Sequence, residues 1–219
     1  MSESAVIFDF NGTLLWDTEV QNKAWDVFLA GHGIWMSDKA KCRRIYGKTN
    51  REIMSDIFKG KCDEGQLLQR AQEKEAVYRE LLGKADLQLA EGVVELFDRL
   101  KAEGIPFAIA TASGWENVSF YIERYGLHRW FAPERIVYND GTLRGKPHPD
   151  LFLRGMERLG VRARKNVVVF EDSMAGIQAA EAAGAGAVVV VDSGGVDCGL
   201  WEGKRHVIRS FLELRGIVL

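Results

Sequence analysis

Short, unbroken apolar runs alternate along the chain with longer segments in which apolar residues recur every three or four positions. The runs lie at residues 5–8, 106–110, 135–138, 166–170 and 187–191. Brief runs rich in branched residues are typical of strands that are buried on both faces of a parallel sheet. Their alternation with helix-length segments predicts an α/β fold with a Rossmann-like, doubly wound parallel sheet as its core.

Two of the intervening segments carry clear helix signals. Residues 91–102 have an apolar stripe that ends before Gly104, and glycine commonly terminates helices. A second helix is expected after Ser173, a good N-cap residue, and it should end before Gly184. The small residues of this second helix allow it to approach the sheet closely.

The first two predicted strands are separated by about ninety residues, whereas an ordinary crossover between parallel strands needs only a dozen or more. Segments with mixed apolar and charged faces fill most of this interval and predict helices at 20–29, 38–46, 50–58 and 64–82. We therefore expect an inserted α-helical cap domain over residues 16–89. Residues 1–15 and 90–219 would then form the α/β core domain.

Composition and charge narrow the choice of partners. The 219 residues are 47% hydrophobic and 27% charged, with a formal net charge of −2 and no long run of Lys or Arg. These values are typical of a globular protein and give no electrostatic footprint for nucleic acid or an anionic membrane. We expect a small-molecule partner, no nucleic-acid or membrane partner, and a monomer or weak dimer.

Cysteine spacing and the terminal sequence bear on the compartment. Cys42, Cys62 and Cys198 lie far apart, so the sequence indicates neither a disulfide framework nor a zinc site. The N-terminus lacks the basic flank and the longer apolar stretch of a signal peptide. No run approaches the roughly 18 apolar residues of a membrane span. These observations predict a cytoplasmic protein.

Polar side chains follow the predicted strands at the points where a ligand would bind. In an open α/β sheet, ligands collect beyond the carboxyl ends of the strands. Segment 9–13 (Asp-Phe-Asn-Gly-Thr) follows the first run, segment 111–113 (Thr-Ala-Ser) follows the second, and Glu171 and Asp172 follow the fourth. Lys146 lies in a proline-containing segment before a further expected helix.

Each of these four signals has an ordinary explanation when it is taken alone. Asn-Gly is a common turn, hydroxyl residues cap helices, a lone lysine is usually solvated, and acidic residues favour helix N-termini. All four occur together and in order, at strand ends that should lie side by side. That coincidence favours one shared site.

The acidic residues of this site indicate a metal. Asp9, Glu171 and Asp172 would bring three carboxylates into one crevice, which is tolerable only with protonation or with a hard divalent cation. Magnesium is the expected cofactor, because it prefers carboxylate, water and phosphate oxygens. The sequence also offers no local His/Cys cluster that would favour zinc.

These motifs resemble those of the haloacid dehalogenase (HAD) superfamily, within its phosphatase and β-phosphoglucomutase-like branch. The family's four motifs correspond to segment 9–13, Thr111, Lys146 and the acidic pair at 171–172, and segment 171–177 (EDSMAGI) is a specific match. The resemblance covers nearly the whole chain, and the predicted insertion resembles the family's helical cap. It implies a phosphoryl transfer in which Asp9 attacks phosphorus and forms an aspartyl-phosphate.

The resemblance also implies roles for the surrounding residues. Lys146 and Thr111 would act with magnesium to stabilise the transferring phosphoryl group. The main-chain carbonyl of Asn11 would join the three carboxylates as a metal ligand. The phosphate of the substrate would be bound by the two loops, through Gly12, Thr13, Ala112 and Ser113.

Asn11 departs from the family pattern, which usually has a second Asp at this position. That Asp is the general acid and base, which contributes roughly a hundredfold to ten-thousandfold in rate, and an amide cannot replace it. Four explanations are open: a slow phosphatase with a good leaving group, a substitute acid or base, a binding protein without turnover, and deamidation of Asn11. The ionisable substitutes near enough in sequence are Asp17, Glu19 and His32.

The cap would supply substrate selection. Segment 46–52 resembles the cap loop that reaches into the site of β-phosphoglucomutase-like proteins, so Lys48 and Arg51 are expected to contact a sugar hydroxyl or a second phosphate. The alternative is that Thr49 or Asn50 caps a helix and that both cations are solvated.

Taken together, the motifs favour a magnesium-dependent phosphomonoester hydrolase that acts on a small phosphorylated metabolite, such as a sugar phosphate, and that is slow because of Asn11. The alternatives are a β-phosphoglucomutase-like phosphomutase and a catalytically weakened phosphate-ester-binding protein.

Overall fold

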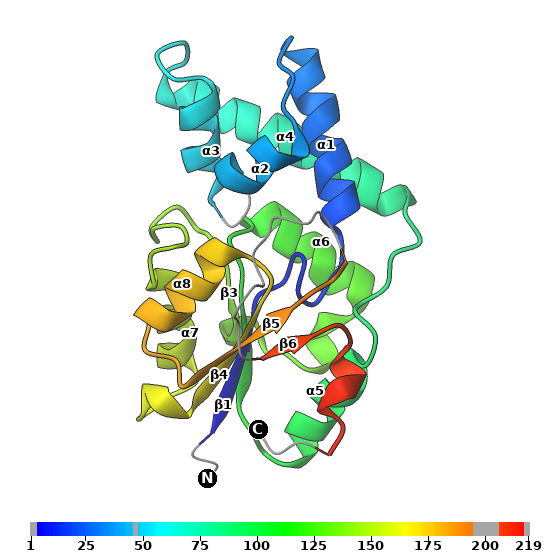
Figure 1. The fold of residues 1–219 in the computed structure, drawn as a ribbon, viewed down its shortest axis with the longest axis vertical. Coiled ribbons are helices and arrows are strands. Elements are labelled where there is room, and N and C mark those ends of the chain that lie inside the picture. The colour runs from blue at the N-terminus through cyan, green and yellow to red at the C-terminus, as the bar shows by residue number, and fades with distance from the viewer. Residues whose placement is uncertain (1–3, 46–47, 195–205, 217–219) are drawn as a thin grey trace.

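The computed structural model describes residues 4–45, 48–194 and 206–216. In this part of the chain, six parallel strands form one sheet in the order β3-β2-β1-β4-β5-β6 (Figure 1). The strands are β1 (Ala5–Phe8), β2 (Phe107–Ala110), β3 (Ile136–Val137), β4 (Val167–Glu171), β5 (Ala187–Val191) and β6 (Val207–Ile208). Since β1 lies between β2 and β4, the strand order reverses beside it, and α/β sheets bind ligands at such a point.

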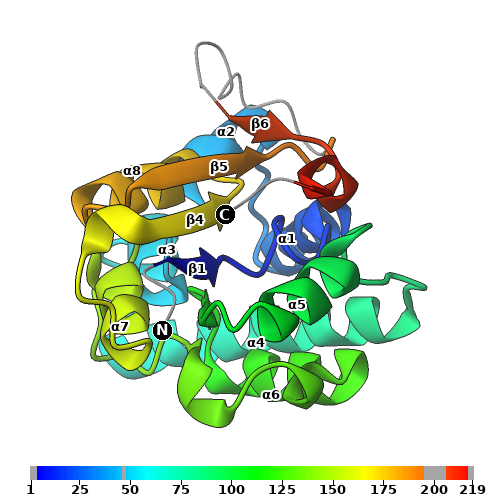
Figure 2. The same cartoon turned by 90° about the horizontal axis from the view of Figure 1, so that it is seen from below.

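Helices cover both faces of the sheet (Figure 2). They are α5 (Val93–Ala102) and α6 (Trp115–Tyr125) on one face, and α7 (Asp150–Arg158) and α8 (Met174–Ala182) on the other. In β1, Val6 and Phe8 pack on the first face, whereas Ala5 and Ile7 pack on the second. Full burial of a ring such as Phe8 contributes about 2–3 kcal/mol. Burial on both faces is the reason that β1 has an unbroken apolar sequence.

Between β1 and β2 the chain forms the helical insertion, which comprises α1 (Thr18–Gly31), α2 (Asp38–Arg44), α3 (Asn50–Ile57) and α4 (Glu64–Lys84). Figure 1 shows these helices beyond the carboxyl ends of the strands. The insertion has a hydrophobic cluster of its own around Trp25 and Phe28. Capping boxes at Thr49 and Asp63 fix the starts of α3 and α4.

Short 3₁₀ turns complete the described elements. They are η1 (Leu127–Arg129), η2 (Pro133–Arg135), η3 (Arg164–Asn166) and η4 (Phe211–Leu214). None of the helices in the described ranges is long and apolar enough to cross a membrane.

The predicted α/β fold with a parallel sheet is confirmed. Each predicted strand begins and ends within one residue of an observed strand, and α1 extends two residues beyond its predicted range at each end. β6 and α6 were not predicted; β6 has only two residues, too few for a sequence pattern. The predicted helix end at Tyr46 lies outside the described residues, and the domain boundaries near residues 15 and 90 stay a prediction.

Gly186 allows the start of β5 to approach the chain before β4. A Cβ atom at Gly186 would lie 1.7 Å from the backbone oxygen of Lys165. Gly186→Ala should therefore lower the free energy of unfolding by about 2–3 kcal/mol, as overpacking does. Gly83→Ala in α4 is the matched control, because nothing lies within 4 Å of its Cβ position. The control should raise the free energy of unfolding by about 0.5–1 kcal/mol. Equal urea denaturation midpoints for the two variants would contradict this account.

Candidate active site

The polar segments at the carboxyl ends of β1, β2 and β4 meet in a cavity of about 650 Å³. Its sheet side is lined by residues of all four predicted motifs, which are Asp9, Asn11, Gly12, Thr111, Ala112, Ser113, Lys146, Glu171 and Asp172. The helical insertion contributes Gln21, Trp25, Arg43, Lys48, Asn50, Lys74 and Glu75. The cavity therefore lies at the edge where α/β sheets bind ligands, between the sheet and the insertion.

Asp9 and Lys146 form a buried ion pair on the sheet side of this cavity. The Lys146 Nζ atom donates to Asp9 Oδ1 at 2.5 Å and to Glu171 Oε1 at 3.4 Å. Burial alone would lower the pKa of Lys146, but the Asp9 and Glu171 carboxylates raise it above its ordinary value, so the ammonium stays charged. Burial raises the pKa of Asp9 to about 7 against the opposing effect of Lys146.

Asp9, Glu171 and Asp172 each place a carboxylate oxygen within 4.8 Å of the others. Burial, followed by the repulsion of the neighbouring carboxylates, raises the pKa of Asp172 well above its ordinary value. Lys146 compensates only part of the negative charge of these three carboxylates. The remaining charge and the oxygen ligands suit a hard divalent cation. These three side chains could hold a metal ion.

Two glycines allow the carboxylates to approach the backbone. A Cβ atom at Gly12 would lie 2.0 Å from Asp172 Oδ2, and Gly12 also has a φ of +82°, which disfavours other residues. A Cβ atom at Gly176, in the first turn of α8, would overlap the Glu171 carboxylate. Ser173 caps α8 by accepting from the Gly176 amide at 3.0 Å, and its hydroxyl donates to Glu171 Oε1 at 3.1 Å. The glycines of both motifs therefore have a steric role.

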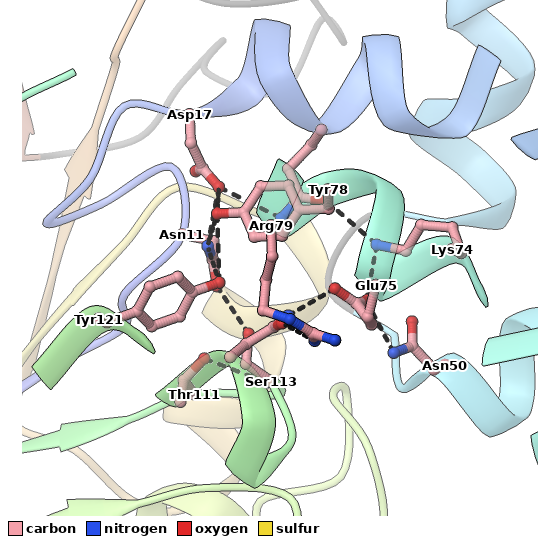
Figure 3. A network of polar contacts seen from close by, with 12 residues as sticks. Asn11, Asp17, Asn50, Lys74, Glu75, Tyr78, Arg79, Thr111, Ser113 and Tyr121 are labelled. Atoms are coloured by element: carbon pink, nitrogen blue, oxygen red, sulfur yellow. Dashed lines mark hydrogen bonds and ion pairs between the residues drawn. The ribbon is translucent and has the colours of Figure 1, made fainter. Parts of the chain in front are cut away.

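The Asn11 side chain is held by four partners where the sheet meets the insertion (Figure 3). Its Nδ2 atom donates to Asp17 Oδ2 at 2.8 Å and to the hydroxyls of Tyr121 and Tyr78 at 3.0 and 3.2 Å. Its Oδ1 atom accepts from the Ser113 hydroxyl at 2.9 Å. Since a carboxylate only accepts hydrogen bonds, Asp17 fixes the orientation of the amide.

The hydrogen bonds around Asn11 help to decide whether a neighbouring residue could act as the general acid or base in its place. Asp17 lines the cavity, but its two oxygens accept hydrogen bonds from Gly12, Asn11, Tyr78 and Gln21. Glu19 and His32 do not line the cavity. Burial raises the pKa of both tyrosines above the ordinary value, so they stay protonated. Glu19 and His32 are therefore poorly placed to transfer a proton. Asp17 lines the cavity and burial raises its pKa above the ordinary value, but both of its oxygens already accept hydrogen bonds.

Deamidation of Asn11 is also disfavoured by its surroundings. The reaction requires the Gly12 nitrogen to attack the side-chain carbonyl carbon of Asn11. The Gly12 amide donates to the Leu15 carbonyl at 2.7 Å and to Asp17 Oδ1 at 3.0 Å, while Ser113 holds the Asn11 oxygen. Both reacting groups are thus held in place in the folded protein.

The other predicted site residues differ in whether they reach the cavity. The Thr111 hydroxyl accepts from the Ser113 amide at 3.1 Å, which orders this loop at the cavity. The Thr13 side chain, predicted to contact the phosphate, is fully buried and does not line the cavity, and its hydroxyl donates to Asp172 Oδ1. Lys48 lines the cavity, whereas Arg51 is exposed and forms an ion pair with Glu64.

Several residues of the site carried no sequence signal. Lys74 and Glu75 have the composition of an ordinary charged helix, and Tyr78 and Tyr121 look like ordinary core residues. Only tertiary structure brings them to the motif loops. Cys42, which also lines the cavity, is disulfide-bonded, a bond that the spacing of the cysteines did not indicate. Cys62 is free, and Cys198 lies outside the described residues.

Comparison with known proteins relates most of the chain to one family. Residues 3–184 match the family model for haloacid dehalogenase-like hydrolases. A phosphorylated carbohydrates phosphatase of Thermotoga maritima is 34% identical over 82% of this chain and 81% of its own length. A fructose-1-phosphate phosphatase of Escherichia coli is 33% identical over 85% of this chain and 96% of its own length. A solved HAD hydrolase of family IA, variant 3, from Entamoeba histolytica is 34% identical with a TM-score of 0.81, and the match covers 96% of this chain and 94% of that one.

The contact between Asn11 and Asp17 predicts that an amide at position 11 is more stable than a carboxylate. Asn11→Asp would place a second carboxylate about 2.8 Å from Asp17, so repulsion should raise the folded-state pKa of the pair above the unfolded value of roughly 3.9. A carboxyl group whose pKa is higher in the folded state than in the unfolded state lowers the free energy of unfolding as the pH rises from the unfolded-state pKa to the folded-state pKa. The variant should therefore lose about 2 kcal/mol more relative to wild type at pH 8 than at pH 5, measured by urea denaturation.

A charge-swapped control separates this effect from simple loss of packing. Asn11→Asp combined with Asp17→Asn restores one amide facing one carboxylate, and it should remove most of the pH dependence. A single variant as stable as wild type at both pH values would show that Asp17 does not select the amide.

Proposed function

The chain belongs to the haloacid dehalogenase-like hydrolase family, and we propose that it is a magnesium-dependent phosphomonoester hydrolase of small phosphorylated metabolites such as sugar phosphates. The observation that carries this proposal is the buried Asp9 carboxylate at the end of β1, paired with Lys146 and surrounded by Glu171 and Asp172. The names of the Thermotoga maritima and Escherichia coli relatives support a phosphorylated carbohydrate as the substrate class.

In the first step of the proposed reaction, an oxygen of Asp9 forms a bond to phosphorus. The bond between phosphorus and the ester oxygen breaks, and that oxygen leaves with its electron pair and takes a proton from water. In the second step, water attacks phosphorus and loses a proton to solvent, the bond between phosphorus and the Asp9 oxygen breaks, and Asp9 keeps the electron pair as phosphate is released. Lys146 favours the ionised Asp9 and lies where it can stabilise negative charge on the phosphoryl oxygens.

Magnesium would be held by Asp9, Glu171, Asp172 and the main-chain carbonyl of Asn11, where it would neutralise charge on the carboxylates and the phosphate. The fit rests on three carboxylate oxygens that lie within 4.8 Å of one another, two from the buried Asp9 and Glu171 and one from the partly buried Asp172. The Thr111 loop and the turn at Gly12 and Thr13 would bind and orient the phosphate.

In this proposal Asn11 is a positioning residue. Its amide hydrogens and its oxygen are engaged by Asp17, Tyr78, Tyr121 and Ser113, and a neutral amide is neither an effective general acid nor an effective general base near neutral pH. Turnover should therefore be slow for esters with poor leaving groups, by up to the roughly hundredfold to ten-thousandfold that a general acid contributes.

Phosphate release tests the nucleophile. Wild type with Mg²⁺ should release phosphate from sugar monophosphates, and Asp9→Asn should reduce kcat by about a thousandfold or more, because a neutral amide of nearly the same size replaces the nucleophilic carboxylate. Asp98→Asn is the control, since Asp98 bonds Trp130 on the surface away from the cavity. If wild type binds sugar phosphates but releases no phosphate, the chain is a binding protein.

Magnesium binding should depend on pH. With the pKa of Asp9 raised to about 7, the metal has to displace a proton at lower pH, so the apparent affinity should fall by about tenfold per pH unit below 7. Titration calorimetry in buffers of different ionisation enthalpy should detect the released proton. Asp172→Asn should weaken binding, and Asp192→Asn should not, because Asp192 lines the cavity outside the carboxylate cluster. Affinity that is constant between about pH 5.5 and 8 would contradict the assignment.

A further inference from the structure

The helical insertion presents a wall of polar side chains to the cavity. We use the name polar wall for Gln21, Asn50, Lys74 and Glu75, all of which line the cavity. Lys74 is only 2% exposed, although charged side chains are almost never buried to this extent without a partner. Figure 3 shows Lys74, Glu75 and Asn50 converging beside the motif loops.

The polar wall is held together by direct contacts. The Lys74 Nζ atom lies 2.6 Å from Glu75 Oε1 and donates to Gln21 Oε1 at 3.3 Å. Asn50 donates to Glu75 Oε1 at 2.8 Å. On the sheet side, Asn117 of α6 donates to the other Glu75 oxygen at 2.5 Å. The Glu75 carboxylate therefore connects the insertion to the core at the cavity.

These contacts cancel the charge of the polar wall. Burial would raise the pKa of Glu75, but Lys74 and the hydrogen bonds from Lys74, Asn117 and Asn50 lower it below its ordinary value. Glu75 is therefore ionised beside Lys74. A buried ion pair of this kind adds little to stability compared with apolar packing, so folding alone does not explain its presence.

The polar wall matches hydroxyl groups better than a second phosphate. A hydroxyl both donates and accepts, so it can donate to the Glu75 carboxylate or the Gln21 oxygen and accept from Asn50 or Lys74. A second phosphate only accepts and carries up to two negative charges, which would face the Glu75 carboxylate in a site of low dielectric. Arg43 and Lys48 also line the cavity, but Arg43 is exposed and Lys48 is only partly buried, so solvent screens both charges.

We propose that Glu75 is a specificity-determining residue, a proposal that rests on the proposed function. Glu75 selects phosphate esters whose organic part is uncharged and rich in hydroxyls, and it rejects bisphosphates. Glu75 acts in two ways: it accepts hydrogen bonds from sugar hydroxyls, and it neutralises the Lys74 ammonium that would otherwise attract a second phosphate. The preference for monophosphates arises from repulsion between the Glu75 carboxylate and a second phosphate, as well as from attractive contacts with hydroxyl groups.

A matched pair of substrates tests this proposal. Fructose 1-phosphate and fructose 1,6-bisphosphate share one sugar and differ by one phosphate. Wild type should favour the monophosphate in kcat/KM by about tenfold or more, and Glu75→Gln should lower that ratio by about tenfold. The lower ratio should come from a lower KM for the bisphosphate, because the amide leaves Lys74 unneutralised. Lys74→Met should change the ratio in the opposite direction.

Glu73→Gln is the matched control on the same helix. Glu73 is partly exposed, contacts Arg70 and does not line the cavity, so the ratio should stay at the wild-type value. Equal wild-type efficiency on both esters, or a ratio unchanged in a Glu75→Gln protein that melts like wild type, would overturn the specificity proposal and leave the phosphatase intact. If wild type releases phosphate from neither ester nor from other monophosphates, the proposed function itself fails.

Discussion

The crowding of three carboxylates beside the buried Lys146 ammonium is the constraint on which the rest of the site depends. Asp9 and the pair of Glu171 and Asp172 meet because β1 and β4 are adjacent and parallel, so their carboxyl ends coincide. Lys146 offsets part of the repulsion, and the missing side chains of Gly12 and Gly176 leave room for the carboxylates. Strongly shifted carboxylates in a cavity are typical of functional sites.

Asn11 lies where this cluster meets the helical insertion. Its amide joins Ser113 and Tyr121 of the core to Asp17 and Tyr78 at the insertion. A carboxylate at this position would face Asp17, whereas an amide satisfies all of its neighbours. The Asn11 amide is thus matched by its local structure, in which each of its polar atoms has a partner.

The two sides of the cavity divide the proposed work between them. Phosphate-handling groups lie on strands and tight turns, which hold them rigidly, while the polar wall lies on helices of the insertion. Glu75 connects these two sides through its hydrogen bond with Asn117. Capture of the phosphoryl group and choice of the organic part are therefore separate properties of the proposed enzyme, set by different residues of one cavity.

The sequence by itself determined the elements whose signals are local. The unbroken apolar run of β1, the position of Asp9 directly after it and the Ser173 cap of α8 follow from burial, strand ends and capping, which act over a few residues. These rules were enough to predict that the four motif segments share one edge of the sheet.

Only the tertiary structure decided which residues of the insertion face that edge. Arg51, for example, was expected to contact a ligand, but it pairs with Glu64 on the surface. The Thr49 capping box starts α3 so that Asn50, and not Arg51, lines the cavity. Likewise Glu75 and Tyr78 lie on α4, whereas their partners Asn117 and Tyr121 lie on α6, far away in the sequence. Helical periodicity identifies an amphipathic face, but the packing of one helix against another decides what that face contacts.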